Sequence, residues 1–363
     1  VPDTGKLRIT VRTGDPTDPD DIAIGNPDAA RSVVVLAEED TDDHDSQVIK
    51  SVLAVVHAER QRQEPMNIVA VIDDPANLQA AELAGRGEAT FVNRRETIAR
   101  MLAHTCRQSG ASVVYGDLLD FDGDEVYFRA DPAHVGKTYG ELLLAWENAT
   151  TIGIGNEEGV ALNPPADRVL QPGESVVAIA EDDSVLEVAT AYEGSWDEAA
   201  ISHAPAVAAA PQRILLVGWN AHTAHVAKEI DEYLEPGSEI VLLSASKTAG
   251  DELRAELPAL KNAALGFECG LPTSRRVLDA VEPTRFDSIV VMADLLERGS
   301  ARADADTLVT LLQLRDIADR AGAAVSITSD LTDDRNRRLA QVANPDDVIV
   351  SDRMIAPDAR AAQ

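Results

Sequence analysis

Short apolar runs alternate with stretches of helical periodicity over the first 110 residues. Residues 32–37 (SVVVLA) and 67–72 are strand-length apolar runs, and residues 89–92 form a shorter one. Continuous apolar runs of this length are typical of strands covered on both faces. Between them, residues 45–60 and 95–107 place apolar side chains three and four positions apart, as one helix face does. This alternation predicts a parallel sheet with right-handed crossovers.

The first residues predict an earlier strand and a short helix. Residues 7–11 alternate apolar and polar side chains and run into Gly14-Asp15-Pro16, so we expect a strand that leaves through a turn. Asp18 and Pro19 then suit the cap and first turn of a helix. A further helix is expected over residues 75–84.

The rhythm changes between residues 111 and 186. Short strands are predicted at residues 125–129, 151–155 and 175–180, separated by Gly, Pro and Asp. This pattern indicates a small α+β lobe. Residues 187–211 have weak periodicity and end in an Ala- and Pro-rich run, which is typical of a linker.

A second α/β unit is predicted over residues 212–355, with a tail at residues 356–363. Its helix at residues 304–320 aligns Leu308, Leu311, Leu312 and Ile317 on one face. Its other expected elements are strands at residues 213–217, 239–243, 264–267, 288–292 and 323–328, and a helix at residues 222–234. We therefore predict an α/β fold class, with Rossmann-like parallel-sheet lobes at residues 1–110 and 212–355 around the α+β lobe. This duplication suggests an internal repeat.

Composition narrows the class of partner. The chain of 363 residues carries 63 acidic and 32 basic side chains, a formal net charge of −31. Such a field repels phosphate backbones, which argues against nucleic acid as a partner. The two cysteines, Cys106 and Cys269, suit a reducing compartment. No apolar run approaches the roughly 20 residues that span a bilayer.

The turn at Gly218 is the candidate nucleotide site. A strand that feeds a helix N-terminus presents N–H groups and a positive dipole end to a phosphate. The dinucleotide-binding pattern, however, needs glycines where Asn220 and Thr223 stand, and Ser244 replaces the acidic residue that holds a ribose. The alternative is a fold inherited without its ligand. The residues expected to bind NAD or another nucleotide are Gly218, Trp219, Asn220 and Ser244.

An acidic cluster follows the predicted strand at residues 32–37. Asp73 follows the next strand, at the same carboxyl edge of the sheet, where open α/β folds bind their ligands. Ca²⁺ takes six to eight oxygen ligands. The alternative is a solvated, helix-capping charge run in a very acidic protein. The candidate Ca²⁺ ligands are Glu38, Glu39, Asp40, Asp42 and Asp43 with Asp73, and Asp45 belongs to the same run.

No catalytic constellation is visible. The sequence holds no nucleophile elbow, zinc-protease motif or Cys/His pattern, so we predict that the chain is not an enzyme. His222 and His225 lie three residues apart at a predicted helix start. They lack a third ligand at matching spacing, which favours capping or surface roles over metal binding.

Three stretches carry a resemblance to one family. The first, at residues 14–18 and 30–37, resembles the middle of the lobe that regulates potassium conductance (the RCK lobe, TrkA-N-like). The second, at residues 135–142, 153–154, 162–164 and 170–174, resembles the TrkA-C-like lobe attached to it. The third, at residues 214–220, 286–289 and 303–317, is similar to the second RCK lobe of the CASTOR/POLLUX ion-channel family.

The resemblance implies a homotetrameric gating ring that senses Ca²⁺ at the cytoplasmic face of a membrane. The ring would lie beneath a potassium- or calcium-conducting pore whose helices precede residue 1. From that resemblance, we expect the given sequence to start after the opening strand, Gly-rich turn and helix of the first lobe, and to stop before a further C-terminal lobe. The alternatives are a soluble NAD-binding regulatory subunit of a potassium uptake transporter and an NAD(P)-dependent oxidoreductase on the same fold.

Overall fold

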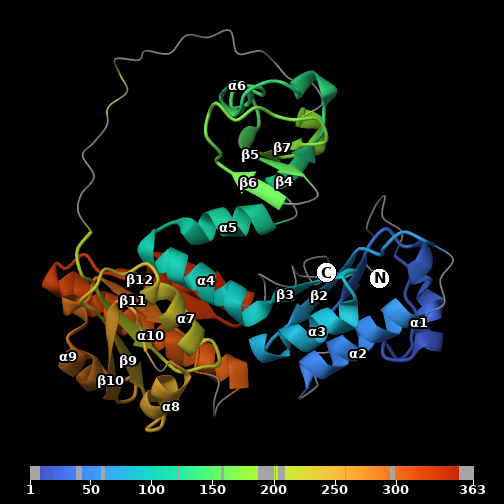
Figure 1. The fold of residues 1–363 in the computed structure, drawn as a ribbon. Helices are drawn as coiled ribbons and strands as arrows, with labels where there is room; N and C mark the ends of the chain where they lie inside the picture. Colours follow the sequence, from blue (N-terminus) through green and yellow to red (C-terminus); the bar gives the residue numbers. More distant parts are fainter. Residues whose placement is uncertain are drawn as a thin grey trace. The chain divides into compact units, whose positions relative to one another are not determined.

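The chain forms two compact units, Val1–Gly110 with Ala210–Gln363 and, separately, Ala111–Ala209. Helices and strands alternate through the first unit (Figure 1). The computed structural model describes residues 9–37, 43–58, 62–120, 123–156, 159–186, 200, 202, 209–257, 259–294 and 299–350. The predicted linker at residues 187–211 and the tail at residues 356–363 lie mostly or wholly outside these residues.

A three-stranded parallel sheet of order β1-β2-β3 forms the first lobe. Its core contains Val52, Ile68 and Ile72, which are fully buried. Asp18 caps α1 by accepting a hydrogen bond from the Asp20 N–H, as the sequence predicted. The elements are α1 Pro19–Gly25, β1 Val33–Val35, α2 His44–His57, β2 Ile68–Ile72, α3 Leu78–Gly85, β3 Ala89–Asn93 and α4 Arg94–Arg107.

The predicted opening strand is wrong where it can be tested. Residues 9–11 have no strand structure, and residues 7–8 lie outside the described part. Ile9 and Val11 are exposed, so this stretch has no core to bury its apolar side chains. Alternation alone cannot form a strand without a neighbour that satisfies its backbone.

Six parallel strands form the sheet of the second lobe, in the order β10-β9-β8-β11-β12-β13. This is the order of a doubly wound dinucleotide-binding fold. The elements are β8 Arg213–Val217, α7 Thr223–Asp231, β9 Ser238–Ser244, α8 Ala249–Glu256, β10 Ala263–Cys269, α9 Arg275–Val281, β11 Ser288–Val291, α10 Gly299–Ala321, β12 Ser326–Leu331, α11 Arg337–Val342 and β13 Asp347–Val350.

Helix α4 follows the first lobe in sequence but packs on the second. Its Ile98 and Leu102 share one core with Leu216 of β8. Ser288 Oγ donates to the Cys106 carbonyl at 3.1 Å, and the Gly110 N–H donates to Asp347 at 2.9 Å. Polar groups of the sheet thus find partners at the C-terminal end of α4, which fixes how the helix lies on the sheet.

One face assignment on α10 is wrong. Leu312 is 50% exposed. Leu311 and Leu314 are buried in the core between α10 and the sheet, which is a different core from the one that α4 completes. Strand β12 also begins at Ser326 rather than at residue 323. Helix α10 runs on to Ala321 and the chain turns at Gly322 (φ 61°), which displaces the strand start.

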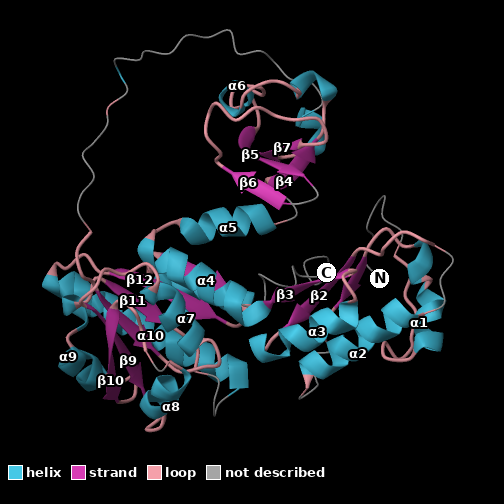
Figure 2. Cartoon of the chain, viewed as in Figure 1, coloured by secondary structure: helices cyan, strands magenta, loops and turns pink. Residues whose placement is uncertain are grey.

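The second unit is an antiparallel sheet of order β4-β7-β5-β6 covered by a short helix (Figure 2). Tyr139, Leu142 and Leu170 lie in its core. Helix α5 was not predicted, because its apolar side chains are not spaced as one buried face. The elements are α5 Ala111–Leu119, β4 Glu125–Arg129, α6 Tyr139–Leu142, β5 Thr150–Asn156, β6 Gly159–Leu162 and β7 Ser175–Ala180.

Among the described residues, no helix combines the length and apolar character needed to cross a membrane.

Candidate functional site

A pocket of about 390 Å³ opens at the carboxyl edge of the six-stranded sheet. It lies where β8 and β11 are neighbours and the crossovers diverge, which is where open α/β sheets bind ligands. Helix α10 forms the opposite wall. The lining residues are 217–218, 245–246, 248, 252, 271–273, 291–292 and 294 from the strand ends and α8, and 303, 306, 307 and 310 from α10.

Gly218 is the predicted nucleotide-site residue that lines this pocket. Its φ is 97°, and a Cβ atom there would lie 2.2 Å from the carbonyl oxygen of Met292. Both the left-handed conformation and the close approach require glycine. The single glycine of this turn therefore brings β8 against the end of β11, whether or not a phosphate binds.

The turn after Gly218 is closed by its own side chains. The Asn220 N–H donates to Thr223 Oγ1 at 2.9 Å, and the His222 N–H donates to Asn220 Oδ1 at 2.9 Å. Asn220 Nδ2 donates to the Ala293 carbonyl at 3.0 Å. These backbone donors are the groups that a pyrophosphate would use in a Gly-rich turn. A phosphate at this position would have to displace Asn220 and Thr223.

Trp219 and Ser244, two of the predicted nucleotide-site residues, are buried and do not line the pocket. Trp219 is buried in the core that α4 completes. Ser244 is fully buried, and its Oγ accepts a hydrogen bond from the Ser246 N–H at 3.1 Å. The structure thus places Gly218 at the pocket, with Trp219, Asn220 and Ser244 in the walls and turns that shape it.

The pocket surface combines hydroxyl groups, carboxylates and apolar side chains. Ser246 and Thr248 hydroxyls lie 3.1 Å apart at one side, and Glu252, Asp294 and Asp306 add carboxylates. Lys and Arg are missing from the described lining residues. The local charge therefore disfavours a phosphate-bearing ligand and favours one that donates hydrogen bonds.

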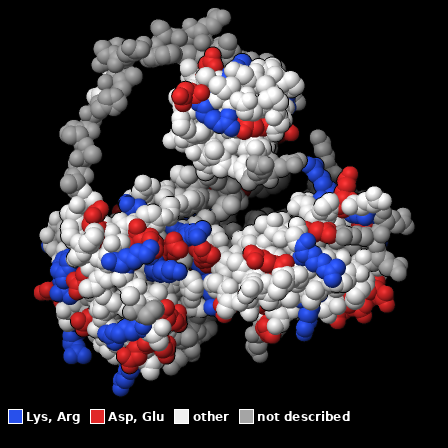
Figure 3. All heavy atoms as spheres, in the orientation of Figure 1, with Lys and Arg blue, Asp and Glu red and all other residues white. Residues whose placement is uncertain are grey.

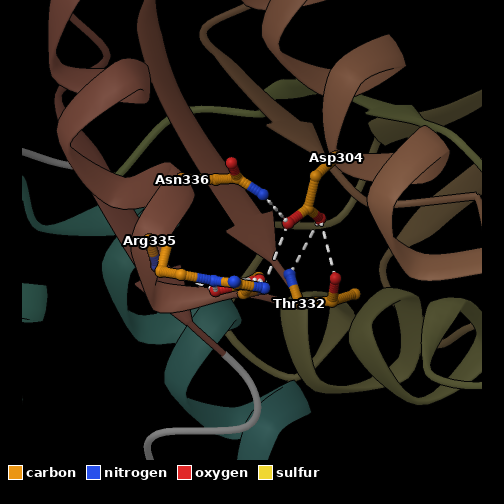
Figure 4. A network of polar contacts seen from close by, with 5 residues as sticks. Asp304, Thr332, Arg335 and Asn336 are labelled. Atoms are coloured by element: carbon orange, nitrogen blue, oxygen red, sulfur yellow. Dashed lines mark hydrogen bonds and ion pairs between the residues drawn. The ribbon is translucent and has the colours of Figure 1, made fainter. Parts of the chain in front are cut away.

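A buried carboxylate holds α10 in place beside this pocket (Figure 4). Asp304 follows the pocket-lining Ala303 and is 0% exposed. It accepts hydrogen bonds from the Thr332 N–H at 2.9 Å, Thr332 Oγ1 at 3.0 Å, the Asp333 N–H at 3.1 Å and Asn336 Nδ2 at 2.7 Å. These bonds join α10 to the loop after β12 and so fix the helical wall of the pocket.

The first lobe contains the same arrangement at the same sequence separations. Asp45 of α2 accepts from the Asp73 N–H at 2.7 Å, the Asp74 N–H at 2.9 Å and Asn77 Nδ2 at 2.8 Å. The separations are 28, 29 and 32 residues, identical to those from Asp304 to its partners.

The repeated carboxylates align two halves of the chain. β1–α2–β2–α3–β3 matches β11–α10–β12–α11–β13 in element order and in parallel pairing. This finding supports the expected internal repeat. Sequence reasoning missed the role of both carboxylates and placed Asp45 in the acidic metal cluster. The matching spacing of the two Asp-Asn pairs was the signal that could have revealed them.

The proposed Ca²⁺ ligands are only partly within the described residues. Glu38, Glu39, Asp40 and Asp42 lie outside them. Hydrogen bonds from the Ser46 side chain and from the Ser46 N–H, the latter at 3.2 Å, lower the pKa of the Asp43 carboxyl, which caps α2.

Asp73, the last of the proposed ligands, is paired with neighbouring side chains. It accepts from Arg94 and lies 3.2 Å from His44 Nδ1. In the part of the chain that the structure describes, no group of three or more His, Cys, Asp and Glu side chains is arranged to hold a metal.

His222 and His225 do not cap α7. His222 occupies the N-cap position without a side-chain capping bond, and the Nδ1 atoms of both rings are buried without a hydrogen-bond partner. Burial, with the nearby Arg95 and Arg94 charges, lowers the pKa of His222 to about 4. The ring is therefore neutral at physiological pH.

Arg side chains lie beside many of the carboxylates of the molecule. Arg275 bonds to Asp279 at 2.8 Å and to Asp316 at 2.5 Å, and Arg168 bonds to Glu174 at 2.5 Å. On the face drawn in Figure 3, acidic and basic side chains are scattered rather than gathered into one patch. Charge alone does not mark a binding surface there.

Comparison with known proteins agrees with this architecture. The family described as Castor and Pollux, part of voltage-gated ion channel, matches residues 95–195. A probable ion channel POLLUX of Oryza sativa subsp. japonica is 25% identical over 98% of this chain and 41% of its own length. A probable ion channel CASTOR of the same species is 29% identical over 85% of this chain and 35% of its own length. The chain thus spans less than half of these relatives.

Among solved structures, the human SLO3 gating ring aligns with a TM-score of 0.66 and 14% sequence identity. The alignment covers 92% of this chain and 68% of that one. At this identity the match establishes the fold of an RCK gating-ring lobe pair. With relatives that align over 85–98% of its length at 25–29% identity, the chain is similar to the CASTOR/POLLUX ion channels.

Proposed function

We propose that this chain is the ligand-sensing regulatory module of a tetrameric cation channel. It acts at the cytoplasmic face of the membrane and couples ligand binding to the opening of a pore formed elsewhere in the polypeptide. The pocket between the β8 and β11 ends and α10 carries this proposal. The relatives named as ion channels favour a channel module over a transporter subunit.

Helix α10 is the element suited to respond to a ligand. One turn of it lines the pocket through Ala303, Asp306 and Thr307, and Asp304 of the same turn is bonded to the loop after β12. A ligand that binds better to one position of this helix shifts the module toward that position by its difference in affinity. Four coupled copies would multiply a modest difference in ligand affinity at each site.

The ligand of this pocket is proposed to be small and free of phosphate groups. Glu252 and Asp306 at the pocket and the self-bonded turn at Asn220 both disfavour a pyrophosphate. NAD therefore remains a weaker candidate than a ligand with hydroxyl or amino groups, such as a nucleoside. Ca²⁺ binding at the acidic run of the first lobe is a separate proposal.

Pocket binding can be tested with a matched pair of substitutions on α10. Ala303 is buried and lines the pocket, whereas Ala305 is exposed on the same helix. Adenosine, NAD(H) and Ca²⁺ should each be titrated calorimetrically at fixed high salt. If adenosine binds in this pocket, its heat of binding should be lost in Ala303→Leu and retained in Ala305→Leu. A heat of NAD(H) binding that both variants retain would show that the ligand binds outside this pocket.

The calcium proposal needs its own variant. Asp40, Asp42 and Asp43 changed together to Asn should abolish saturable Ca²⁺ heat and leave adenosine binding intact. Ca²⁺ binding unchanged by these substitutions would refute this site. In the full-length channel, Ala303→Leu should also remove the response of open probability to the pocket ligand, while Ala305→Leu should retain it.

A further inference from the structure

Helices α4 and α7 lie side by side (Figure 1). Arg100 of α4 lies 3.7 Å from Glu229 of α7, and His104 Nε2 lies 2.9 Å from the Tyr233 hydroxyl. Both pairs are 129 residues apart in sequence, as are the first residues of the two helices. The helices are therefore parallel, and their N-terminal ends lie together. Each end has backbone N–H groups without a helical acceptor and the positive end of a helix dipole.

Four side chains at this shared end have a nitrogen without an acceptor in the described part of the chain. Asn93, the N-cap of α4, is 7% exposed and accepts from the Glu96 N–H at 2.8 Å through Oδ1, but its buried Nδ2 has no partner. The Nδ1 atoms of His222 and His225 are likewise buried without a partner. Arg95 is partly buried and makes no hydrogen bond or ion pair with a described residue. We call these four residues the α4–α7 site.

Buried donors without acceptors are uncommon in proteins, and this set also lies in a positive local field. Burial, and then the charge of Arg95, lowers the pKa of His222, and the opposing effect of Asp73 is smaller. Arg94 is ion-paired with Asp73, so Arg95 supplies the charge that is left uncompensated. A partly buried charge without a partner is costly in a folded protein. The four residues thus share the lack of one partner, an anion.

The α4–α7 site is separate from the pocket at the ends of β8 and β11. Its four residues are not among the described residues that line the pocket. His222 and His225 share a face of α7 with Glu229 and Tyr233, because these residues follow one another at three or four positions. That face is the one in contact with α4. A ligand of the α4–α7 site would therefore bind between the two helices, away from the pocket ligand.

We propose that the α4–α7 site binds a phosphate-type oxyanion. The oxygens of one such group can accept hydrogen bonds from the Asn93 amide, the Arg95 guanidinium and an imidazole at once. The two helix N-termini add backbone donors and a favourable dipole. The neutral ring of His222 donates in the tautomer that carries its proton on Nδ1. The bound anion connects α4, which follows the first lobe, to the first helix of the second lobe.

Electrostatics favours an anion over a metal ion at the two histidines. Besides burial, which has the largest effect, the charges of Arg95 and Arg94 lower the pKa of His222. The same charges would repel a metal cation. Within the described residues, no group of three or more His, Cys, Asp and Glu side chains could hold a metal, and two ring nitrogens fall short of the ligands that a zinc site needs.

The test is calorimetric titration of the whole chain with inorganic phosphate at neutral pH in about 0.15 M KCl. Asn93→Asp keeps the oxygen that caps α4 but replaces the unpartnered donor with a negatively charged oxygen. It should weaken phosphate binding at least about tenfold, and Arg95→Gln should act in the same direction. Arg276→Gln is the matched control, because Arg276 is also the second residue of a helix but is exposed. It should change the affinity less than about twofold.

Glycerol 3-phosphate, titrated in parallel, identifies the source of the phosphate group. Binding of either ligand supports the site if Asn93→Asp and Arg95→Gln weaken it, and tighter binding of the ester assigns the site to an organic phosphate. Two results overturn the proposal. One is a wild-type chain that binds neither ligand. The other is binding that both substitutions leave unchanged while circular dichroism shows the variants folded.

Discussion

Replacement of Asp304 by alanine tests whether the buried carboxylate holds α10. The substitution removes four hydrogen bonds at 2.7–3.1 Å and leaves the Thr332 and Asp333 N–H groups and Asn336 Nδ2 without their acceptor. Loss of one partner of a buried charged network costs about 3–5 kcal/mol. We expect Asp304→Ala to lower the free energy of unfolding by about 4 kcal/mol. Asp304→Asn keeps one accepting oxygen and should cost about 2 kcal/mol.

The assay is urea unfolding at fixed KCl and pH 7, with the urea dependence compared between variants. Asp45→Ala removes the equivalent three bonds in the first lobe and should cost about 3 kcal/mol. Asp319→Ala is the control, because Asp319 is exposed near the end of α10 and should change stability by less than about 0.5 kcal/mol. A loss below about 1 kcal/mol for Asp304→Ala would refute the anchoring role.

Three further predictions concern backbone, thiols and pH. Gly218→Ala should lower the free energy of unfolding in urea by more than about 2 kcal/mol, because the added Cβ meets the Met292 carbonyl. Gly322 is the control, since it also has a positive φ but has open space around it. Gly322→Ala should cost only about 1 kcal/mol. Burial raises the pKa of the Cys106 thiol to about 11, so Ellman's reagent at pH 8 should titrate one thiol, Cys269, in the folded chain and two in urea. The pKa of His222 is about 4 when folded and about 6.5 when unfolded, so the unfolded chain binds the proton first and stability falls as pH drops through this window. His222→Gln should remove up to roughly 3 kcal/mol of that fall, and equal pH dependence of the two chains would contradict the buried neutral ring.

The central strands β8, β9 and β11 of the second lobe were predictable because they are buried on both faces. Residues 214–217 are apolar throughout, and the strand predicted at residues 213–217 matches β8 residue for residue. The edge strand β4 was also predicted at its observed bounds, because turn-forming residues precede and follow it in the sequence. Periodicity failed where burial is partial, as at Leu312, and at α5, where of the described side chains only Ser112 is buried.

The candidate site was only partly predictable. Gly218 was predictable as a site residue because it lies in the turn between a strand and a helix, and the structure places it at the pocket. Ala303 and Thr307 of the pocket lie about 85 residues further on, and nothing local marks them as its other wall. The role of Asp304 depends on backbone donors 28 and 29 residues away, which carry no side-chain signature.

The sequence by itself determined the fold class and the family resemblance. These properties depend on local periodicity, turn residues and short motifs. Tertiary structure alone decided that α4 completes the second lobe, that Asn220 and Thr223 close the turn after Gly218, and that Asp45 and Asp304 are equivalent anchors. These features join residues distant in the chain, and their energies come from burial and hydrogen bonds that exist only after the strands have paired.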